Sequence, residues 1–173
     1  ATWYAWRAET PAAAPTIRSV AVLPLRNLSR DSEQDFLADG TTEALIARLA
    51  QIHALGVASR ASVVRYRNTD KPMAEIGREL GIDAIVDGSV QRVNGRVRVS
   101  IQLVDAARDR HLWAETFDRD STNVLDLQAE IAQAVAEEIR VQITPEEQVR
   151  LRRVRSVKPD AQEAYLLGRY HFW

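Results

Sequence analysis

The 173-residue chain contains no cysteine. Disulfide bonds, thiolate nucleophiles and cysteine-ligated zinc are therefore all excluded. A cysteine-free chain suits oxidising and reducing surroundings equally, so the sequence leaves the redox compartment open. Neither sign of charge predominates, because 23 Lys and Arg oppose 24 Asp and Glu for a formal net charge of −1. That balance argues against direct contact with nucleic acid, which usually requires a strongly basic surface.

Motifs that carry catalysis or hold a cofactor are missing as well. Only seven glycines are present, none of them in a phosphate-binding array, and neither Gly-x-Ser-x-Gly nor Ser-x-x-Lys occurs. The acidic residues before the first long helix lack the glycine and the terminal glutamate of a calcium loop, so we interpret them as solvated carboxylates near a helix start: Asp31, Glu33, Asp35 and Asp39. We expect no catalytic, metal-binding or cofactor-binding residues, no cofactor, and no enzyme activity in this chain.

No apolar run approaches the roughly 18 residues that a membrane-spanning helix needs, and no signal-peptide pattern is present. The first seven residues nevertheless include Trp3, Tyr4, Trp6 and Arg7. Because Trp and Tyr gather at membrane interfaces with Arg or Lys just beyond, residues 1–16 are interpreted as a linker that carries the end of a transmembrane helix. The alternative is a disordered linker with chance aromatic residues.

The N-terminal half alternates buried strands with helices. Residues 19–25 are a short apolar run containing a proline, which predicts a buried strand, and residues 26–35 are typical of a loop. Gly56 is expected to end the next helix before a second strand begins at Val57, and a short helix is predicted from Pro72 to Gly81. The apolar stripe of the longer helix has steps of three and four residues: Leu37, Thr41, Leu45, Leu49 and Ile52.

The strongest local pattern is a β-hairpin. Asn94-Gly95 is the signature of a two-residue type I′ turn. From that turn one register sorts both faces of the hairpin, with apolar pairs on one side and polar pairs on the other. The apolar pairs are Val90–Val99, Gly88–Ile101 and Val86–Leu103; the polar pairs are Asp87–Gln102, Ser89–Ser100 and Gln91–Arg98. Residues 111–117 are predicted to form the third strand of a meander.

The C-terminal part is predicted to be helical. Ser121 or Thr122 is expected to cap a long helix that runs to Ile139, and Thr144-Pro145-Glu146-Glu147 predicts a new helix start. The fold class is therefore α/β (α+β): a mixed sheet containing an antiparallel meander, helices packed on it, and a C-terminal helical extension.

Several blocks of the sequence, in order and at matching spacing, resemble the TolB amino-terminal-like domain family. They include Ser19-Val20-Ala21-Val22-Leu23-Pro24-Leu25, Phe36-Leu37-Ala38-Asp39-Gly40, Glu75-Ile76-Gly77-Arg78-Glu79-Leu80-Gly81, Gln102-Leu103-Val104-Asp105-Ala106 and His111-Leu112-Trp113-Ala114-Glu115. Near the end, Ala164-x-x-Leu167-Gly168-x-x-His171 partly resembles the first helix of a tetratricopeptide repeat. The expected organisation is a linker over 1–16, the α/β domain over 17–143, a connecting helix over 144–158, and the first helix of a truncated repeat over 159–173.

The resemblance implies a domain between an output module and tetratricopeptide repeats. The output in this family is often a winged-helix DNA-binding domain with a transmembrane helix, as in CadC-type acid sensors, or an adenylate cyclase or serine/threonine kinase. The resemblance implies no catalytic motif in this domain.

Two sets of residues are candidates for binding or sensing. Arg60, Arg65 and Tyr66 follow a predicted strand, where open α/β sheets often present ligand sites, and predict a binding surface. His53 and His111 are candidates for pH sensing, because histidine titrates near neutrality and the resemblance includes acid sensors; structural or solvated histidines are the alternative.

A basic run lies toward the end of the chain: Arg150, Arg152, Arg153, Arg155 and Lys158. DNA or anionic lipid could be its partner, but an amphipathic helix with its arginines in water is the favoured interpretation.

Our hypothesis is a non-catalytic sensory or coupling domain of a bacterial membrane-bound transcriptional regulator. It would lie on the extracytoplasmic (periplasmic) side of the inner membrane, tethered through a segment upstream of Ala1. Its partners would be other proteins or its own tetratricopeptide repeats, with a small molecule as a candidate signal and no direct nucleic-acid contact. The alternative is a cytoplasmic protein-interaction domain of an adenylate cyclase or kinase that carries such repeats.

Overall fold

The first strand is bent by a proline and continues alongside the same neighbour. The computed structural model describes residues 17–139, in which β1 (Ser19–Val22) and β2 (Arg26–Asn27) both pair in parallel with β4 (Ala84–Val93). Between them Pro24 has no N–H to donate, and the Leu25 N–H turns to the Thr42 hydroxyl at 3.0 Å. Thr42 in turn donates to the Ala38 carbonyl oxygen at 2.8 Å. The Thr42 hydroxyl thus provides the hydrogen-bond acceptor for the Leu25 N–H where the strand is interrupted.

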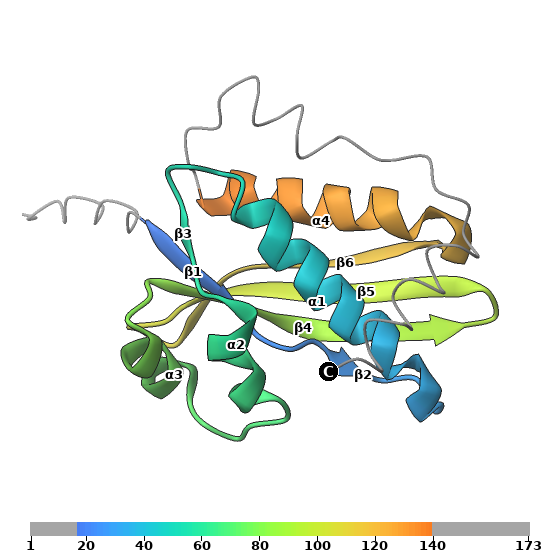
Figure 1. The fold of residues 1–173 in the computed structure, drawn as a ribbon, viewed down its shortest axis with the longest axis horizontal. Helices are drawn as coiled ribbons and strands as arrows, with labels where there is room; N and C mark the ends of the chain where they lie inside the picture. Colours follow the sequence, from blue (N-terminus) through green and yellow to red (C-terminus); the bar gives the residue numbers. More distant parts are fainter. Residues whose placement is uncertain (1–16, 140–173) are drawn as a thin grey trace, which may run out of the picture.

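The six strands form one mixed sheet in the order β3-β1-β4-β5-β6, with β2 beside β4 (Figure 1). β3 (Gly56–Val57) runs parallel to β1, whereas β5 (Arg96–Asp105) and β6 (Arg110–Asp120) extend the sheet as an antiparallel meander. The predicted fold class, a mixed sheet with a meander and packed helices, is confirmed.

The hairpin register agrees with the sequence prediction at every predicted pair. β4 and β5 align Val90 with Val99, Gly88 with Ile101 and Ser89 with Ser100. The turn residues Asn94 and Gly95 have φ values of 51° and 74°, as a type I′ turn requires. The third strand, β6, is longer than predicted and continues to Asp120.

Helices cover most of one face of the sheet and a smaller part of the other. On the first face α1 (Asp35–Leu49) packs against α4 (Val124–Ile139), and both cover a large apolar cluster. On the second face α2 (Arg60–Val63), the 3-10 turn η2 (Val64–Tyr66) and α3 (Met73–Leu80) cover a smaller cluster. Figure 1 shows these last elements gathered at one end of the sheet.

Some element boundaries differ from the sequence predictions. α1 ends at Leu49 rather than near Gly56, which belongs to β3; Ile52 is buried in the turn that follows the helix. Pro72 precedes α3 as its N-cap instead of occupying the first helical position, whereas Gly81 ends the helix in the predicted left-handed conformation, with φ 64°. Ser121 begins a 3-10 turn, η3 (Ser121–Asn123), and its N–H donates to the Gly95 carbonyl at 2.8 Å.

Among the segments that the sequence did not predict, two depend on long-range contacts. β2 lies inside the stretch predicted as a loop, and α2 with η2 follows the second strand. Both are short, and both are stabilised by contacts from distant parts of the chain. The predictions for residues 1–16 and 144–173, including the membrane anchor, the connecting helix and the repeat, lie outside the described residues.

Candidate functional site

The partly covered face of the sheet exposes a polar area beyond α3. The covered end is apolar, because Ala21 and Ile85 of the sheet pack against Val63, Tyr66 and Ile76. Further along the hairpin the same face carries mainly polar side chains, and no helix within residues 17–139 lies over them. A polar surface of this kind needs no cover to be stable, and it extends over β4, β5 and the edge strand β6.

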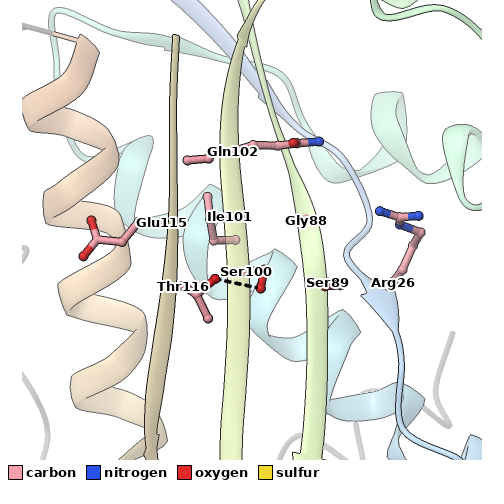
Figure 2. A pocket seen from close by; sticks show the side chains of 9 residues that line it. Arg26, Gly88, Ser89, Ser100, Ile101, Gln102, Glu115 and Thr116 are labelled. Atoms are coloured by element: carbon pink, nitrogen blue, oxygen red, sulfur yellow. Dashed lines mark hydrogen bonds between the residues drawn. The ribbon is translucent and has the colours of Figure 1, made fainter. Parts of the chain in front are cut away.

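A shallow hollow of about 270 Å³ lies in this open face, which we call the polar hollow (Figure 2). Its floor is a row of hydroxyls from three adjacent strands: Ser89 of β4, Ser100 of β5 and Thr116 of β6. The Ser100 and Thr116 hydroxyl oxygens are 3.1 Å apart and share a hydrogen bond. At one end the Gln102 amide donates to the buried Asp87 carboxylate at 2.9 Å.

Arg26 borders the polar hollow on the β2 side. Its register partner is Ser89, so the Arg26 side chain stands on the same face as the hydroxyl row. Within the part of the chain that the structure describes, the Arg26 guanidinium has no ion pair and no hydrogen bond. An unpaired guanidinium beside uncharged hydroxyls is a donor group available to a ligand or partner.

Two other arginines of this face are already neutralised. Arg96 and Arg98 donate to the Asp118 carboxylate at 2.8 and 2.9 Å, and Arg96 also reaches Asp120 at 3.1 Å. The hydrogen bonds from Arg98 and then Arg96 lower the pKa of Asp118. Arg26, in contrast, keeps its donors free at the polar hollow.

Beneath the hollow, Gly88 of β4 has no room for a side chain. A Cβ built on Gly88 would lie 2.0 Å from the Ser100 carbonyl oxygen, far inside contact distance. No larger residue fits there without moving β4 away from β5. The pairing of β4 with β5 at this point therefore requires glycine at position 88.

The predicted binding residues Arg60, Arg65 and Tyr66 lie elsewhere, on α2 and η2. Arg60 pairs with Glu43 of α1 at 3.1 Å, and Arg65 donates to the Tyr66 hydroxyl at 2.7 Å. The Tyr66 side chain is buried in the smaller cluster, and its hydroxyl donates to Glu79 of α3 at 2.5 Å. All three side chains have partners within the domain, and their role as a binding surface stays a prediction.

Further ion pairs connect the neighbourhood of Arg60, Arg65 and Tyr66 to α3 and α1. Lys71 donates to Glu79 at 2.6 Å, and Arg67 pairs with Asp39 of α1. Hydrogen bonds from Lys71 and then Tyr66 lower the pKa of Glu79, and its hydrogen bond to Glu79 raises the pKa of Lys71. The network ties α2, η2 and α3 to one another and to α1.

The two histidines proposed for pH sensing are not brought together. His53 lies in the turn before β3, and His111 lies on β6, at the opposite edge of the sheet. Four strand spacings separate these edges, which is about 19 Å. Both side chains are exposed, and pH sensing by either one stays a prediction.

The acidic residues in and just before the first turns of α1 do not converge on one point. Asp35 accepts from the Asn27 amide at 2.6 Å, Asp31 accepts from Gln34 at 3.4 Å, and Asp39 faces Arg67. Across residues 17–139 no group of three or more His, Cys, Asp or Glu side chains is placed to hold a metal ion.

Sequence reasoning identified the polar side of the hairpin but not the hollow. The alternation placed Ser89, Ser100 and Gln102 on one face correctly. What it could not show is that α3 stops short of them, or that Arg26 lies beside Ser89. The sequence did contain one indication that this face is open, because every pair on it from Asp87–Gln102 to Gln91–Arg98 is polar.

Comparison with known proteins shows which family the chain resembles. A family model described as "HilA/YgeH-like transcriptional regulator, second domain" matches residues 16–134. The "Putative adenylate cyclase 3" of Rhizobium meliloti (strain 1021) is 35% identical over 162 residues. That match covers 94% of this chain but only 28% of the relative, so most of the relative has no counterpart here.

Solved structures show the same fold at low sequence identity. TolB from Acinetobacter baumannii matches with a TM-score of 0.54 at 15% identity, over 72% of this chain and 29% of TolB. The LpoB C-terminal domain from Salmonella enterica matches with a TM-score of 0.50 at 17% identity, over 63% of this chain and 87% of that domain. The resemblance to TolB noted in the sequence is therefore a similarity of fold.

Proposed function

Because this chain belongs to the family of second domains of HilA/YgeH-like transcriptional regulators, we propose that it is a non-catalytic sensory and coupling domain. It acts by binding, and the regulator's output lies in another part of the protein. The observation that carries this proposal is the polar hollow with the unpaired Arg26 at its border.

The polar hollow suits a partner that presents a carboxylate among polar groups. Arg26 supplies a planar fork of donors, which binds a carboxylate with two parallel hydrogen bonds. The hydroxyls of Ser89, Ser100 and Thr116 donate or accept as the partner requires. Because strand pairing fixes the backbone of the floor, binding has to order few further groups.

The setting that we propose is a membrane-bound regulator. The aromatic start at Trp3, Tyr4 and Trp6 supports an anchor upstream of this chain, and the domain would lie on the extracytoplasmic side with a winged-helix output across the membrane. No helix in the described part of the chain is long and apolar enough to span a bilayer. Partner proteins, or tetratricopeptide repeats of the same protein, would dock on the open face. The signal would change how strongly they associate with this domain.

A second setting is favoured by the Rhizobium meliloti relative. Its similarity extends over 94% of this chain, so the same domain could regulate an adenylate cyclase, with any cyclase activity in sequence outside this chain. In that setting the domain acts in the cytoplasm, and binding at the open face changes cyclic-AMP synthesis instead of transcription. The chemistry of the polar hollow is the same in both.

The test replaces Arg26 by alanine in the full-length protein. Arg78→Ala is the matched control, because Arg78 is an exposed arginine on α3 without a side-chain partner in the described residues. Transcription of a reporter and cellular cyclic AMP are both measured with and without stimulus. We expect Arg26→Ala to reduce the stimulated output about tenfold, the cost of one charged hydrogen-bonded contact, and Arg78→Ala to leave it unchanged.

The readout that responds identifies the setting. Changed transcription supports the membrane regulator, and changed cyclic AMP supports the cyclase. If Arg26→Ala folds normally and alters neither output, binding at the open face is disproved.

A further inference from the structure

Beyond the polar hollow, the open face of the sheet carries two exposed aliphatic side chains. Val93 is the last residue of β4 and is 50% exposed. It follows Ser89 and Gln91 at alternate positions of the strand, so all three side chains stand on the same face. Leu28, just after β2, is 53% exposed. Exposed aliphatic groups on an otherwise polar surface are a common feature of contacts with other proteins.

Leu28 lies on the same face as Val93. Its N–H donates to the Val90 carbonyl at 2.9 Å, so the pairing of β2 with β4 continues to this residue. The preceding side chain, Asn27, points to the other face, where its amide donates to Asp35 of α1 at 2.6 Å. Because successive side chains of an extended chain alternate between the two faces, Leu28 stands on the open face.

The two aliphatic side chains continue a line that begins at Arg26. Arg26 opposes Ser89 in the parallel register. At the rise of a strand, Leu28 is about 7 Å further along β2, and Val93 is about 13 Å beyond Ser89 along β4. In the other direction lies the carboxylate of Asp87, which repels a second carboxylate. A carboxylate ligand held by Arg26 therefore extends toward Leu28 and Val93 and away from α3.

These dimensions suit a polypeptide better than a small molecule. The polar hollow has a volume of about 270 Å³, whereas sites for small ligands usually enclose about 300–1,000 Å³. Leu28 and Val93 are not part of its lining. A ligand that contacts Arg26 and both aliphatic side chains has to span about 13 Å along the surface.

We propose that the open face binds an extended segment of a partner protein that carries an acidic side chain and, two and four residues further on, aliphatic side chains. The acidic side chain pairs with Arg26, and the aliphatic ones lie over Leu28 and Val93. This inference rests on the proposed function and specifies the partner. Side chains at alternate positions of an extended segment share one face and are about 7 Å apart, which matches the spacing of the three contacts.

The hydroxyls of the polar hollow favour an extended segment over a helix. An extended segment brings unpaired backbone N–H and C=O groups, and serine and threonine hydroxyls can donate to or accept from them. A helix has already paired these groups internally. The polar floor therefore gives an extended backbone hydrogen bonds that it would not give a helix.

The test titrates two blocked pentapeptides into the isotope-enriched 173-residue chain and follows its amide NMR signals. Acetyl-Glu-Ser-Leu-Ser-Val-amide has the proposed spacing, and acetyl-Gln-Ser-Leu-Ser-Val-amide differs from it only by the loss of the charge. We expect the first peptide to shift the signals of Arg26, Leu28 and Val93 saturably. The second should bind about tenfold more weakly, because it loses the charge-assisted hydrogen bonds to the guanidinium.

A double variant tests the aliphatic contacts. Leu28→Ser with Val93→Thr removes them, and threonine keeps a β-branched side chain on β4. Both positions are exposed, so the spectrum of the free variant should remain that of a folded chain. We expect the variant to bind the glutamate peptide about tenfold more weakly. The matched control is Val64→Thr, at a 44% exposed position on η2, which should leave binding unchanged.

Three outcomes would overturn the proposal. The first is the absence of a saturable shift on the open face up to the solubility limit of the glutamate peptide. The second is equal affinity of this peptide for wild type and for the folded double variant. The third comes from sodium acetate as a separate probe: if acetate binds as tightly as the peptide, the open face holds a small carboxylate and no polypeptide. In each case Arg26→Ala can still reduce the stimulated output, so the proposed function is tested independently.

Discussion

Asp83 joins two strands at the point where the sheet begins. One of its carboxylate oxygens accepts hydrogen bonds from the backbone N–H groups of Arg18 and Ser19, at 2.9 and 3.0 Å, and from the Ser19 hydroxyl at 3.0 Å. These residues are 64 and 65 positions away in sequence. The backbone hydrogen bond from Arg18, followed by those from Ser19, lowers the pKa of Asp83.

This shift predicts a pH-dependent contribution to stability. The folded-state pKa of Asp83 lies below its unfolded value, so its stabilising effect is present above about pH 4 and is lost as the pH falls through the folded pKa. Because the side chain is exposed, we expect Asp83→Asn to lower the free energy of unfolding by only about 1 kcal/mol at pH 7. The difference from wild type should shrink toward pH 3 in urea titrations. Asp70→Asn, at an exposed carboxylate without a side-chain partner in residues 17–139, should show no such difference.

At the scale of elements, α2 and η2 are the clearest case of structure made by distant contacts. α2 has four residues and η2 has three, too few for a helix to be stable by itself. Ser59 caps α2 by accepting from the Ser62 N–H at 3.3 Å, Arg60 reaches α1, and Tyr66 reaches α3. The segment is therefore stabilised mainly by the elements on either side of it.

Tyr66→Phe tests this connection without emptying the core. The ring stays buried, but Glu79 loses its hydroxyl donor, so we expect the free energy of unfolding to fall by about 1–2 kcal/mol. The pKa of Glu79 should rise toward its ordinary value, because the Tyr66 hydrogen bond helps to lower it. Carboxyl-carbon NMR titration measures this change. Arg65→Gln, at a side chain that is 61% exposed, should change stability by less than about 0.5 kcal/mol.

At the scale of the whole molecule, the two apolar clusters share one strand. Along β4, Val86 and Val90 belong to the large cluster under α1 and α4, while Ile85 belongs to the smaller one under α3. All three are buried, at 2% exposure or less. The two faces therefore depend on the same backbone and should unfold together.

Ile76→Ala tests this cooperativity. Ile76 of α3 is fully buried in the smaller cluster, so the cavity should cost about 2–5 kcal/mol. We expect amide probes on α4, in the other layer, to shift their unfolding midpoint by the same amount as probes on α3. A smaller shift on α4 would mean that α3 opens independently of the main core. Ala74→Gly, on the same helix at a half-buried position, should cost only about 1 kcal/mol.

Local pattern was enough to predict most of the sheet and its helices. The type I′ turn at Asn94 and Gly95 determined the hairpin register, and the spacing of Leu37, Leu45 and Leu49 identified the inward face of α1. These features depend on residues a few positions apart, whose backbone geometry has a fixed period. The same blocks of sequence also carried the resemblance to a TolB-like fold.

The sequence by itself thus determined which residues face the core and how the hairpin strands align. Only the tertiary structure decided which surfaces stay open: Arg26 lies beside Ser89, far along the chain, and Glu115 faces α4 across the edge of the sheet. The same holds for the ion pair of Arg67 with Asp39. The reason is physical, since periodicity reports the direction of a side chain relative to its own element, whereas the extent of cover by α3 and α4 depends on how separate elements pack.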